Sequence, residues 1–187
     1  MSRRVAVVDA NVLYSIELTD LLLTFAAHRI VRLHWSPTIL DEVQRNLAKR
    51  ADLTPDAIDY RIDRMNLAVP AALDEAPESL VAAMPIIAHD RHVLALAVHV
   101  EADSIVTFNA RDFPLVACEP HGVEVAHPDS FAVAVVESHP ARVDAALADI
   151  ARRRTRPAMT VHEILDRLAV VVPAFVSRVR ATSLGTA

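Results

Sequence analysis

The amino-acid sequence predicts an α/β protein in which helices cover both faces of a parallel sheet. Short β-branched runs such as residues 5–8 are apolar throughout, which is typical of strands buried on both faces. These runs alternate with longer segments of helical periodicity, as parallel strands joined by helical crossovers require. After Pro128 the strands stop and only helical segments follow. We therefore expect an α/β domain over residues 1–128 and a helical C-terminal extension over residues 129–187.

Capping signals divide the first third of the chain into elements. Ser36-Pro37 and Thr54-Pro55 each place an N-cap residue before a proline at the first helical position, so a helix is predicted to begin at each proline. The predicted elements are, in order, a strand at residues 5–8, a helix over 12–28, a strand at 33–35, and helices over 37–50 and 55–67.

The rest of the chain contains further strands and helices. Residues 68–88 are interrupted by prolines and favour no element. Thr160 and Glu163 form a capping box that predicts the start of a helix, and Pro173 is expected to kink or split that helix. The predicted elements are a helix over residues 90–101, strands at 104–108 and 123–125, and helices over 129–137, 141–154 and 161–180.

The composition excludes several classes of protein. Only two glycines, Gly122 and Gly185, occur among the 187 residues, so the chain has neither a dinucleotide-binding G-x-G-x-x-G loop nor a P-loop. The single cysteine, Cys118, excludes a disulfide framework and a multi-cysteine metal site. The sequence shows no secretion signal, and no apolar run reaches the roughly 18 residues that a membrane span needs. A soluble, cytoplasmic protein without membrane contact is therefore expected.

The formal net charge of −5 argues against a generally basic, nucleic-acid-binding surface, but the charge is unevenly distributed. Residues 1–128 hold 18 acidic and 11 basic side chains, whereas residues 129–187 hold 6 acidic and 8 basic ones. The densest basic run contains Arg152, Arg153, Arg154 and Arg156. These arginines are candidates for contacts with RNA phosphates or with an acidic partner. Alternatively, they complement the dipole at the C-terminal end of a helix.

Acidic and amide side chains occur where the predicted strands end and where the neighbouring helices begin. They are Asp9 after the first strand, Glu42 and Asp90 near the starts of two helices, and Asn109 and Asp112 after the strand at residues 104–108. The carboxyl ends of parallel strands form the functional crevice of such sheets, so we expect these side chains to lie together. Carboxylates that share a crevice raise one another's pKa unless a cation neutralises them, and oxygen ligands suit Mg²⁺ or Mn²⁺. The alternative is that each acid caps a helix or is solvated at the surface.

Four segments around these residues match sequence motifs of a known family, in the order in which the family has them. They are Val7-Val-Asp9-Ala-Asn-Val12, Trp35-Ser-Pro37 leading to Leu40-Asp-Glu42-Val43, His89-Asp90-Arg-His-Val-Leu-Ala-Leu-Ala97, and Ala102-Asp-Ser-Ile-Val-Thr-Phe-Asn109-Ala-Arg-Asp112-Phe113. Over residues 4–130 the chain resembles the PIN-domain ribonucleases, and most closely the VapC-type toxins of toxin–antitoxin pairs. The resemblance implies a Rossmann-like α/β/α sandwich and an endoribonuclease that depends on Mg²⁺ or Mn²⁺. It also implies a cognate antitoxin protein as partner and, as is usual in the family, a homodimer.

The resemblance also assigns roles to individual residues. Asp9, Glu42 and Asp90 match the three leading acids of the family, which bind metal and carry catalysis. Many members have an aspartate at the position of Asn109, whereas Asp112 belongs to an Asn-x-x-Asp-Phe variant. These two residues therefore share the fourth assignment, with Asn109 as a neutral metal ligand or as a residue that holds a water.

Several other side chains are candidates for substrate contacts. Thr107 is expected to orient a ligand or a phosphate through its hydroxyl, unless that hydroxyl bonds to nearby backbone. Asn11 is a candidate for a hydrogen bond to the first acid or to a water at the metal, although turn chemistry explains it equally well. His89 and His92 are either substrate contacts or surface histidines. Arg152, Arg153 and Arg154 complete the candidate substrate-binding set.

The extension carries an apolar stripe at helical spacing, formed by Leu165, Leu168, Val172 and Phe175. We expect this stripe to pack on the α/β domain or on a neighbouring protomer. A groove for an antitoxin is the alternative.

Two other functions compete with RNA cleavage. A haloacid-dehalogenase-like phosphatase also has an acid after its first strand, but it needs Asp-x-Asp where this chain has Asp9-Ala-Asn11. It also needs a later catalytic lysine, for which Lys49 is poorly placed. The non-enzyme alternative is a PIN-fold interaction protein with weakened catalysis, and Asn109 supports it.

Overall fold

The centre of the structure, a computed structural model that describes residues 3–183, is a sheet of four parallel strands. The strands are β1 (Arg4–Val8), β2 (Val31–His34), β3 (Ser104–Val106) and β4 (Glu124–Ala126), in the spatial order β2-β1-β3-β4. In this register Val7 pairs with His34 of β2 and with Ile105 of β3. The chain passes from β1 to β2 on one side and then to β3 on the other, so the strand order reverses at β1.

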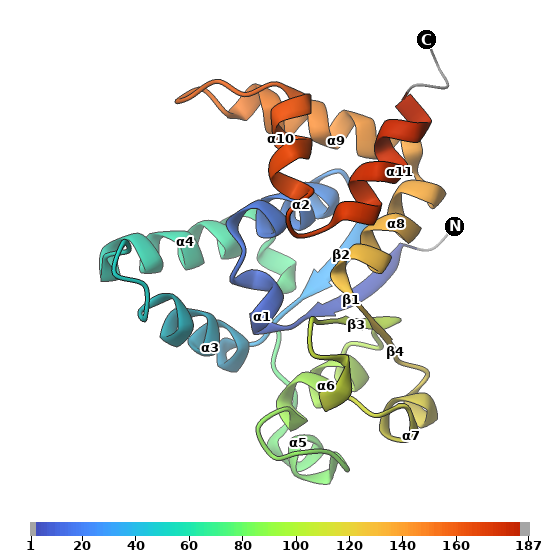
Figure 1. Ribbon diagram of the computed structural model, residues 1–187. Helices are drawn as coiled ribbons and strands as arrows, with labels where there is room; N and C mark the ends of the chain where they lie inside the picture. Colours follow the sequence, from blue (N-terminus) through green and yellow to red (C-terminus); the bar gives the residue numbers. More distant parts are fainter. Residues whose placement is uncertain (1–2, 184–187) are drawn as a thin grey trace.

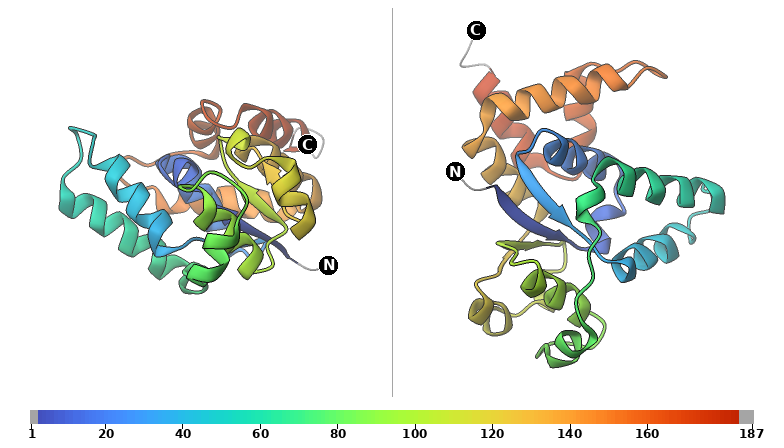
Figure 2. Two further views of the ribbon diagram at one scale, coloured as in Figure 1. Left: turned by 90° about the horizontal axis from the view of Figure 1, so that it is seen from below. Right: turned by 180° about the vertical axis from the view of Figure 1, so that it is seen from behind.

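Helices flank this sheet on both sides. They are α1 (Ala10–Leu13), α2 (Ile16–Ala27), α3 (Pro37–Leu47), α4 (Pro55–Ala68), α5 (Glu78–Ala83), α6 (Arg91–His99), α7 (Leu115–Cys118), α8 (Pro128–Ser138), α9 (Pro140–Arg153), α10 (Val161–Leu168) and α11 (Pro173–Ser183), with 3₁₀ turns η1 (Pro70–Ala72), η2 (Ala110–Asp112) and η3 (Glu119–His121). Figures 1 and 2 show α2 and the C-terminal helices on one side of the sheet and α5, α6 and α7 on the other. The predicted α/β/α arrangement with a central parallel sheet is therefore confirmed.

The strands are apolar because both of their faces are covered. Val7, Val8 and Ile105 are fully buried, and residues 93–97 of α6 are buried as well. This helix packs against β1 and β3, while α2 packs against β2. Burying a side chain of this size stabilises the fold by roughly 1.5–3 kcal/mol relative to leaving it exposed. The core thus holds the carboxyl ends of β1 and β3 in a fixed relation.

The apolar stripe of the extension is buried against the rest of the chain. Its members Leu165, Leu168, Val172 and Phe175 are at most 5% exposed. The ring of Phe175 lies edge-on to Phe25 of α2, with centroids 6.1 Å apart. Phe175 therefore packs on the α/β domain, which is one of the two arrangements predicted for the stripe.

Pro173 splits the helix predicted over residues 161–180. It begins α11, and the chain leaves helical geometry after α10. The Asp129 carboxylate of α8 accepts hydrogen bonds from the backbone N–H groups of Ala174 (3.0 Å) and Phe175 (2.8 Å). A side chain of another helix thus caps the start of α11.

The prediction of one helix over residues 12–28 is wrong, because the chain breaks between α1 and α2. Ser15 caps α2, and its Oγ accepts a hydrogen bond from the Leu18 N–H (3.3 Å). Arg61 of α4 donates to the carbonyl oxygen of Leu13 (2.6 Å), which the break leaves without a helical partner. Because the side chain of Ser15 competes for backbone hydrogen bonds, α1 ends earlier than the periodicity predicts.

Residues 68–88, which favoured no element, form η1 and α5. The strand predicted at residues 33–35 lies slightly earlier, as β2, and Trp35 instead forms an isolated bridge with Leu73. No helix within residues 3–183 is long and apolar enough to cross a membrane.

Candidate active site

The carboxyl ends of β1 and β3 meet where the strand order reverses, which is where open α/β sheets bind their ligands. Asp9 directly follows β1, and its N–H donates to the carbonyl oxygen of Val106 at the end of β3 (3.1 Å). Thr107 follows β3, so the strand predicted over residues 104–108 ends earlier than expected. The Thr107 hydroxyl donates to Asp9 Oδ2 (2.6 Å), and both side chains are buried.

Asn11, in the first turn of α1, completes a hydrogen-bond network around this pair. Its Nδ2 donates to Asp9 Oδ2 (2.6 Å) and to Thr107 Oγ1 (3.0 Å). Its Oδ1 accepts from the Phe108 N–H (3.1 Å), and Thr107 Oγ1 accepts from the Asn109 N–H (3.0 Å). The loop that follows β3 is therefore fixed against the start of α1.

Four acids from distant parts of the sequence act on one another electrostatically here. Burial raises the pKa of Asp9 despite the hydrogen bond from Thr107, and the charge of Asp112 raises it further. Burial also raises the pKa of Glu42, and the charges of Asp9 and Asp90 add to that effect. Burial is also the largest cause of the raised pKa of Asp90, and the charges of Asp112 and Asp9 raise it further. The structure therefore brings all four predicted acids into one electrostatic site.

Two buried polar atoms in this site have no hydrogen-bond partner, namely Asp90 Oδ2 and His92 Nε2. His92 Nε2 lies 3.7 Å from Glu42 Oε1, and His89 Nε2 lies 3.1 Å from Asp90 Oδ2. Burial lowers the pKa of His92, which favours the neutral imidazole. Leaving a buried donor or acceptor unpaired is unfavourable, so such atoms in a native structure point to a ligand or to a catalytic role.

A polar cleft of about 340 Å³ opens beside Glu42. His89 and His92 line it, together with Glu75 and Glu78, which the sequence did not indicate as site residues. These two acids lie in the proline-interrupted stretch that favoured no element. The density of acids in that stretch was the one signal that could have identified them.

Asn109 and Asp112, which share the fourth assignment, have different surroundings. The charge of Asp112 raises the pKa of both Asp9 and Asp90. Asn109 is exposed and contributes backbone contacts, since its N–H donates to Thr107 Oγ1 and its carbonyl accepts from the Asp112 N–H (3.0 Å). In the described part of the chain its side-chain amide makes no hydrogen bond.

The donors of the site fit a hard divalent cation. Carboxylate oxygens are the ligands that Mg²⁺ and Mn²⁺ prefer, and Oδ2 of Asp90, which contacts His89 Nε2 but accepts no hydrogen bond, is a buried ligand atom of that kind. Within residues 3–183, however, no three His, Cys, Asp or Glu side chains lie close enough to enclose a metal ion in their present positions. The argument that a divalent cation fits this site therefore rests on the carboxylate ligands and on the negative charge of the acids.

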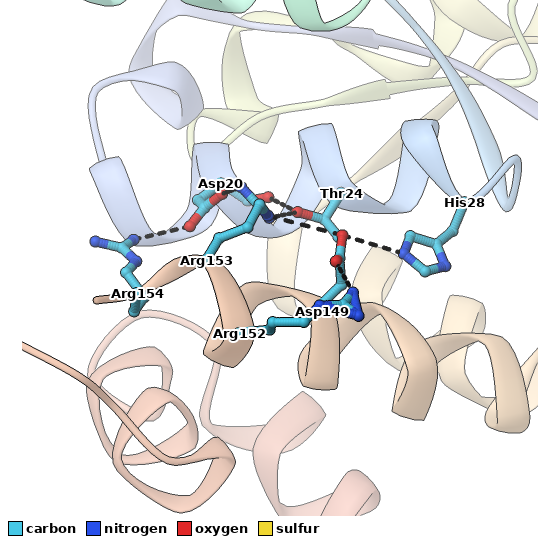
Figure 3. Close-up of polar contacts among 7 residues, drawn as sticks. All are labelled: Asp20, Thr24, His28, Asp149, Arg152, Arg153 and Arg154. Atoms are coloured by element: carbon cyan, nitrogen blue, oxygen red, sulfur yellow. Dashed lines mark hydrogen bonds and ion pairs between the residues drawn. The ribbon is translucent and has the colours of Figure 1, made fainter.

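The arginines predicted to contact substrate lie elsewhere, at the junction of α9 with α2 (Figure 3). Arg153 and Arg154 each pair with Asp20 of α2, at 3.2 and 2.8 Å. Arg152 pairs with Asp149 of its own helix. The structure thus does not join these arginines to the acids that follow the strands.

The phosphatase alternative receives no geometric support. Lys49 donates to Asn46 Oδ1 at the exposed end of α3 (2.9 Å), not to any of the four acids. Asn11 presents an amide to Asp9 where that chemistry requires a second carboxylate.

Comparisons with known proteins agree with this geometry. Residues 5–111 match the PIN domain family, and residues 128–181 match the family described as VapC50 C-terminal domain. The chain is 36% identical over 101 residues to the "Putative ribonuclease VapC50" of Mycobacterium tuberculosis (strain ATCC 25618 / H37Rv). The aligned region covers 54% of this chain and 60% of that relative. No solved structure matches the chain. Because the PIN-domain match spans more than half of the chain and the sheet has the expected topology, the protein belongs to the PIN-domain family.

Proposed function

We propose that this protein is an endoribonuclease that depends on Mg²⁺ or Mn²⁺ and hydrolyses phosphodiester bonds in RNA. Family membership and the ribonuclease name of the relative support this function. The observation that carries it is the raised pKa of Asp9, Glu42 and Asp90, which persists although Arg45 and His89 lie nearby. Burial is the largest cause of each raised pKa and the neighbouring acids add to it, so these carboxylates gain free energy when a cation binds.

In this function the carboxylates of Asp9, Glu42 and Asp90 hold the cation. Asp112, whose charge acts on two of them, is the fourth site acid in preference to Asn109. A divalent cation bound here would neutralise the carboxylates, polarise a phosphate oxygen and activate an attacking water. Without it, the carboxylates repel the negatively charged RNA backbone.

Thr107 and Asn11 act as positioning residues. Both donate hydrogen bonds to Oδ2 of Asp9, at 2.6 Å each, and this fixes the orientation of the carboxylate. Thr107 is fully buried, so its hydroxyl acts through Asp9 and does not meet the RNA. Replacing Thr107 with valine, which keeps the shape and removes the donor, should therefore weaken metal binding more than RNA binding.

Cleavage of a labelled RNA by the purified protein tests the function. We expect cleavage with Mg²⁺ or Mn²⁺, none with a chelator, and loss of cleavage in Asp90→Asn. Lys49→Ala is a matched control, because it removes a charge at an exposed position outside the site. Metal-independent cleavage, or full activity in Asp90→Asn, would contradict the assignment.

We further propose that the enzyme acts in the cytoplasm as the toxin of a toxin–antitoxin pair, in which it is held inactive by a cognate antitoxin protein. The VapC50 name of the relative and the match of residues 128–181 to the VapC50 C-terminal domain support this role. Expression of the chain alone should arrest growth, and co-expression of a small DNA-binding-type protein encoded immediately upstream should restore it. Growth that continues without the antitoxin, while the purified protein still cleaves RNA, would indicate a housekeeping nuclease.

A further inference from the structure

An exposed aromatic side chain lies directly beside the carboxylate site. Phe108 follows Thr107, and its backbone N–H donates to Asn11 Oδ1 (3.1 Å). The residue is nevertheless 36% exposed, although Phe is one of the types most often found buried. Its backbone is therefore fixed at the site while its ring faces solvent.

A second exposed ring lies against it. His127 is the first residue after β4 and Phe108 the second after the neighbouring β3, and their ring centroids are 5.1 Å apart in an edge-on arrangement. His127 Nδ1 accepts a hydrogen bond from the Asp129 N–H at the start of α8 (3.2 Å), which orients the imidazole. Two adjacent strand ends thus present a pair of oriented rings next to the acids.

A cationic side chain without a partner belongs to the same loop. Arg111 is exposed in η2, three residues after Phe108. It makes no ion pair or hydrogen bond with the described residues, in contrast to Arg153 and Arg154, which pair with Asp20. Its guanidinium is therefore free to contact a phosphate.

Resting on the proposed RNA cleavage, we propose that Phe108, His127 and Arg111 form a binding subsite for one unpaired nucleotide of the RNA. The base stacks on the Phe108 ring, His127 supports that ring from the side, and Arg111 contacts the phosphate backbone. Every base has a flat π face, whereas a base inside a duplex is already stacked on both sides. A duplex therefore offers this site nothing to stack.

Binding measured with Mg²⁺ present in an Asp90→Asn background, in which we expect no cleavage, separates this site from the chemical step. The probes are a fluorescently labelled single-stranded oligoribonucleotide and the same strand annealed to its complement, followed by anisotropy. For Phe108→Leu, which keeps an apolar side chain and removes the ring, we expect Kd for the single strand to rise about tenfold, as the loss of one stacked base predicts. Phe108→Tyr should restore binding to within about twofold, and Kd for the duplex should not change in either variant.

The control is Leu67→Ala, which removes an even more exposed apolar side chain from α4, at 66% exposure. It should leave both Kd values unchanged. Arg111→Ala should reduce the slope of log Kd against log salt by about 0.7, as the loss of one phosphate contact on a single strand predicts. Arg64→Ala, an exposed arginine of α4, should leave the slope unchanged.

The outcomes also separate this site from the proposed function. Suppose that the wild type cleaves RNA but Phe108→Leu binds the single strand normally, or that its affinity for the single strand and for the duplex falls equally. The stacking site is then wrong and the ribonuclease assignment stands. If the wild type neither binds nor cleaves RNA, the proposed function fails and the stacking site fails with it.

Discussion

The carboxylate site and the α2–α9 junction both gather charged side chains from distant parts of the chain, but they balance charge in opposite ways. At the junction Asp20 lies between Arg153 and Arg154, so positive and negative groups pair within hydrogen-bond distance. At the carboxylate site Asp9 and Asp90 lie among other acids, and burial and mutual repulsion raise the pKa of both.

The difference identifies which cluster needs a ligand. The junction is neutralised by its own side chains and attaches the extension to the α/β domain, as Figure 3 shows. Of these two clusters the carboxylate site is the one whose charge is not compensated, so a cation gains more free energy there than at the junction. Charge density in the sequence pointed to Arg152, Arg153 and Arg154 as ligand contacts, whereas charge balance in the structure points to the acids.

The largest effect is expected from Asp90→Asn. The substitution removes a charge from the site, together with the ion-pair contact between Oδ2 and His89 Nε2 (3.1 Å). RNA cleavage should fall by about two orders of magnitude or more, and the melting temperature without metal should rise because repulsion among the acids is relieved. Initial rates and thermal melts of both proteins check this prediction. Lost activity with a lowered melting temperature would instead indicate a folding defect.

The fourth site residue can be distinguished next. Asp112 acts electrostatically on Asp9 and Asp90, whereas the side chain of Asn109 is not hydrogen-bonded. We expect Asp112→Asn to reduce Mn²⁺ affinity and cleavage by about tenfold or more, and Asn109→Ala to change either by less than about threefold. Calorimetric titration with Mn²⁺ measures the affinity. The reverse ranking would make Asn109 the ligand.

A smaller effect is expected at the junction. Arg153→Ala removes an ion pair to Asp20 and a hydrogen bond to Thr24 Oγ1 (2.7 Å). Because the arginine is half exposed, the loss of unfolding free energy should be about 1 kcal/mol. Urea denaturation measures it, and turnover of a short oligonucleotide should not change. A fall in that turnover in a protein that still unfolds cooperatively would place the arginine in the active site.

RNA contact by the same arginines predicts an effect on long substrates. A phosphate bound by Arg152, Arg153 or Arg154 would have to replace Asp149 or Asp20 as partner. If such contacts form, the triple alanine variant should raise KM for long RNA several-fold and flatten its salt dependence, while kcat on a short oligonucleotide stays constant. An unchanged KM on long RNA would leave these arginines a structural role only.

The smallest effect is on the pH dependence of stability without metal. Asp90 has a folded-state pKa above 3.8, so the folded protein binds its proton more tightly than the unfolded chain does. Its contribution is fully present below about pH 3.8 and is lost as the pH rises through the raised pKa. The wild type should therefore lose more unfolding free energy than Asp90→Asn across this window. Equal slopes of unfolding free energy against pH would show that burial does not hold the proton on Asp90.

The fold and the acids followed from local sequence signals, while other features required the three-dimensional structure. Strand runs ending at Asp9, together with caps such as Ser36, act through neighbouring residues and could be predicted. The break between α1 and α2 has a local signal in the Ser15 cap, but the contact from Arg61 of a distant helix, which also supports it, could not be predicted. The pairing of Arg153 with Asp20 likewise depends on how α9 docks on α2, which periodicity does not specify.

The most direct test of the central claim, that the carboxylate site is incomplete without a cation, compares the melting temperatures of the wild type and Asp90→Asn with and without Mn²⁺. Without metal, the account predicts that Asp90→Asn melts at the higher temperature. With saturating Mn²⁺, the order should reverse, because the wild type binds the ion more tightly and is stabilised in proportion to that binding. If Mn²⁺ shifts both proteins equally, or the wild type is already the more stable without metal, the uncompensated charge is not a metal site and the account is contradicted.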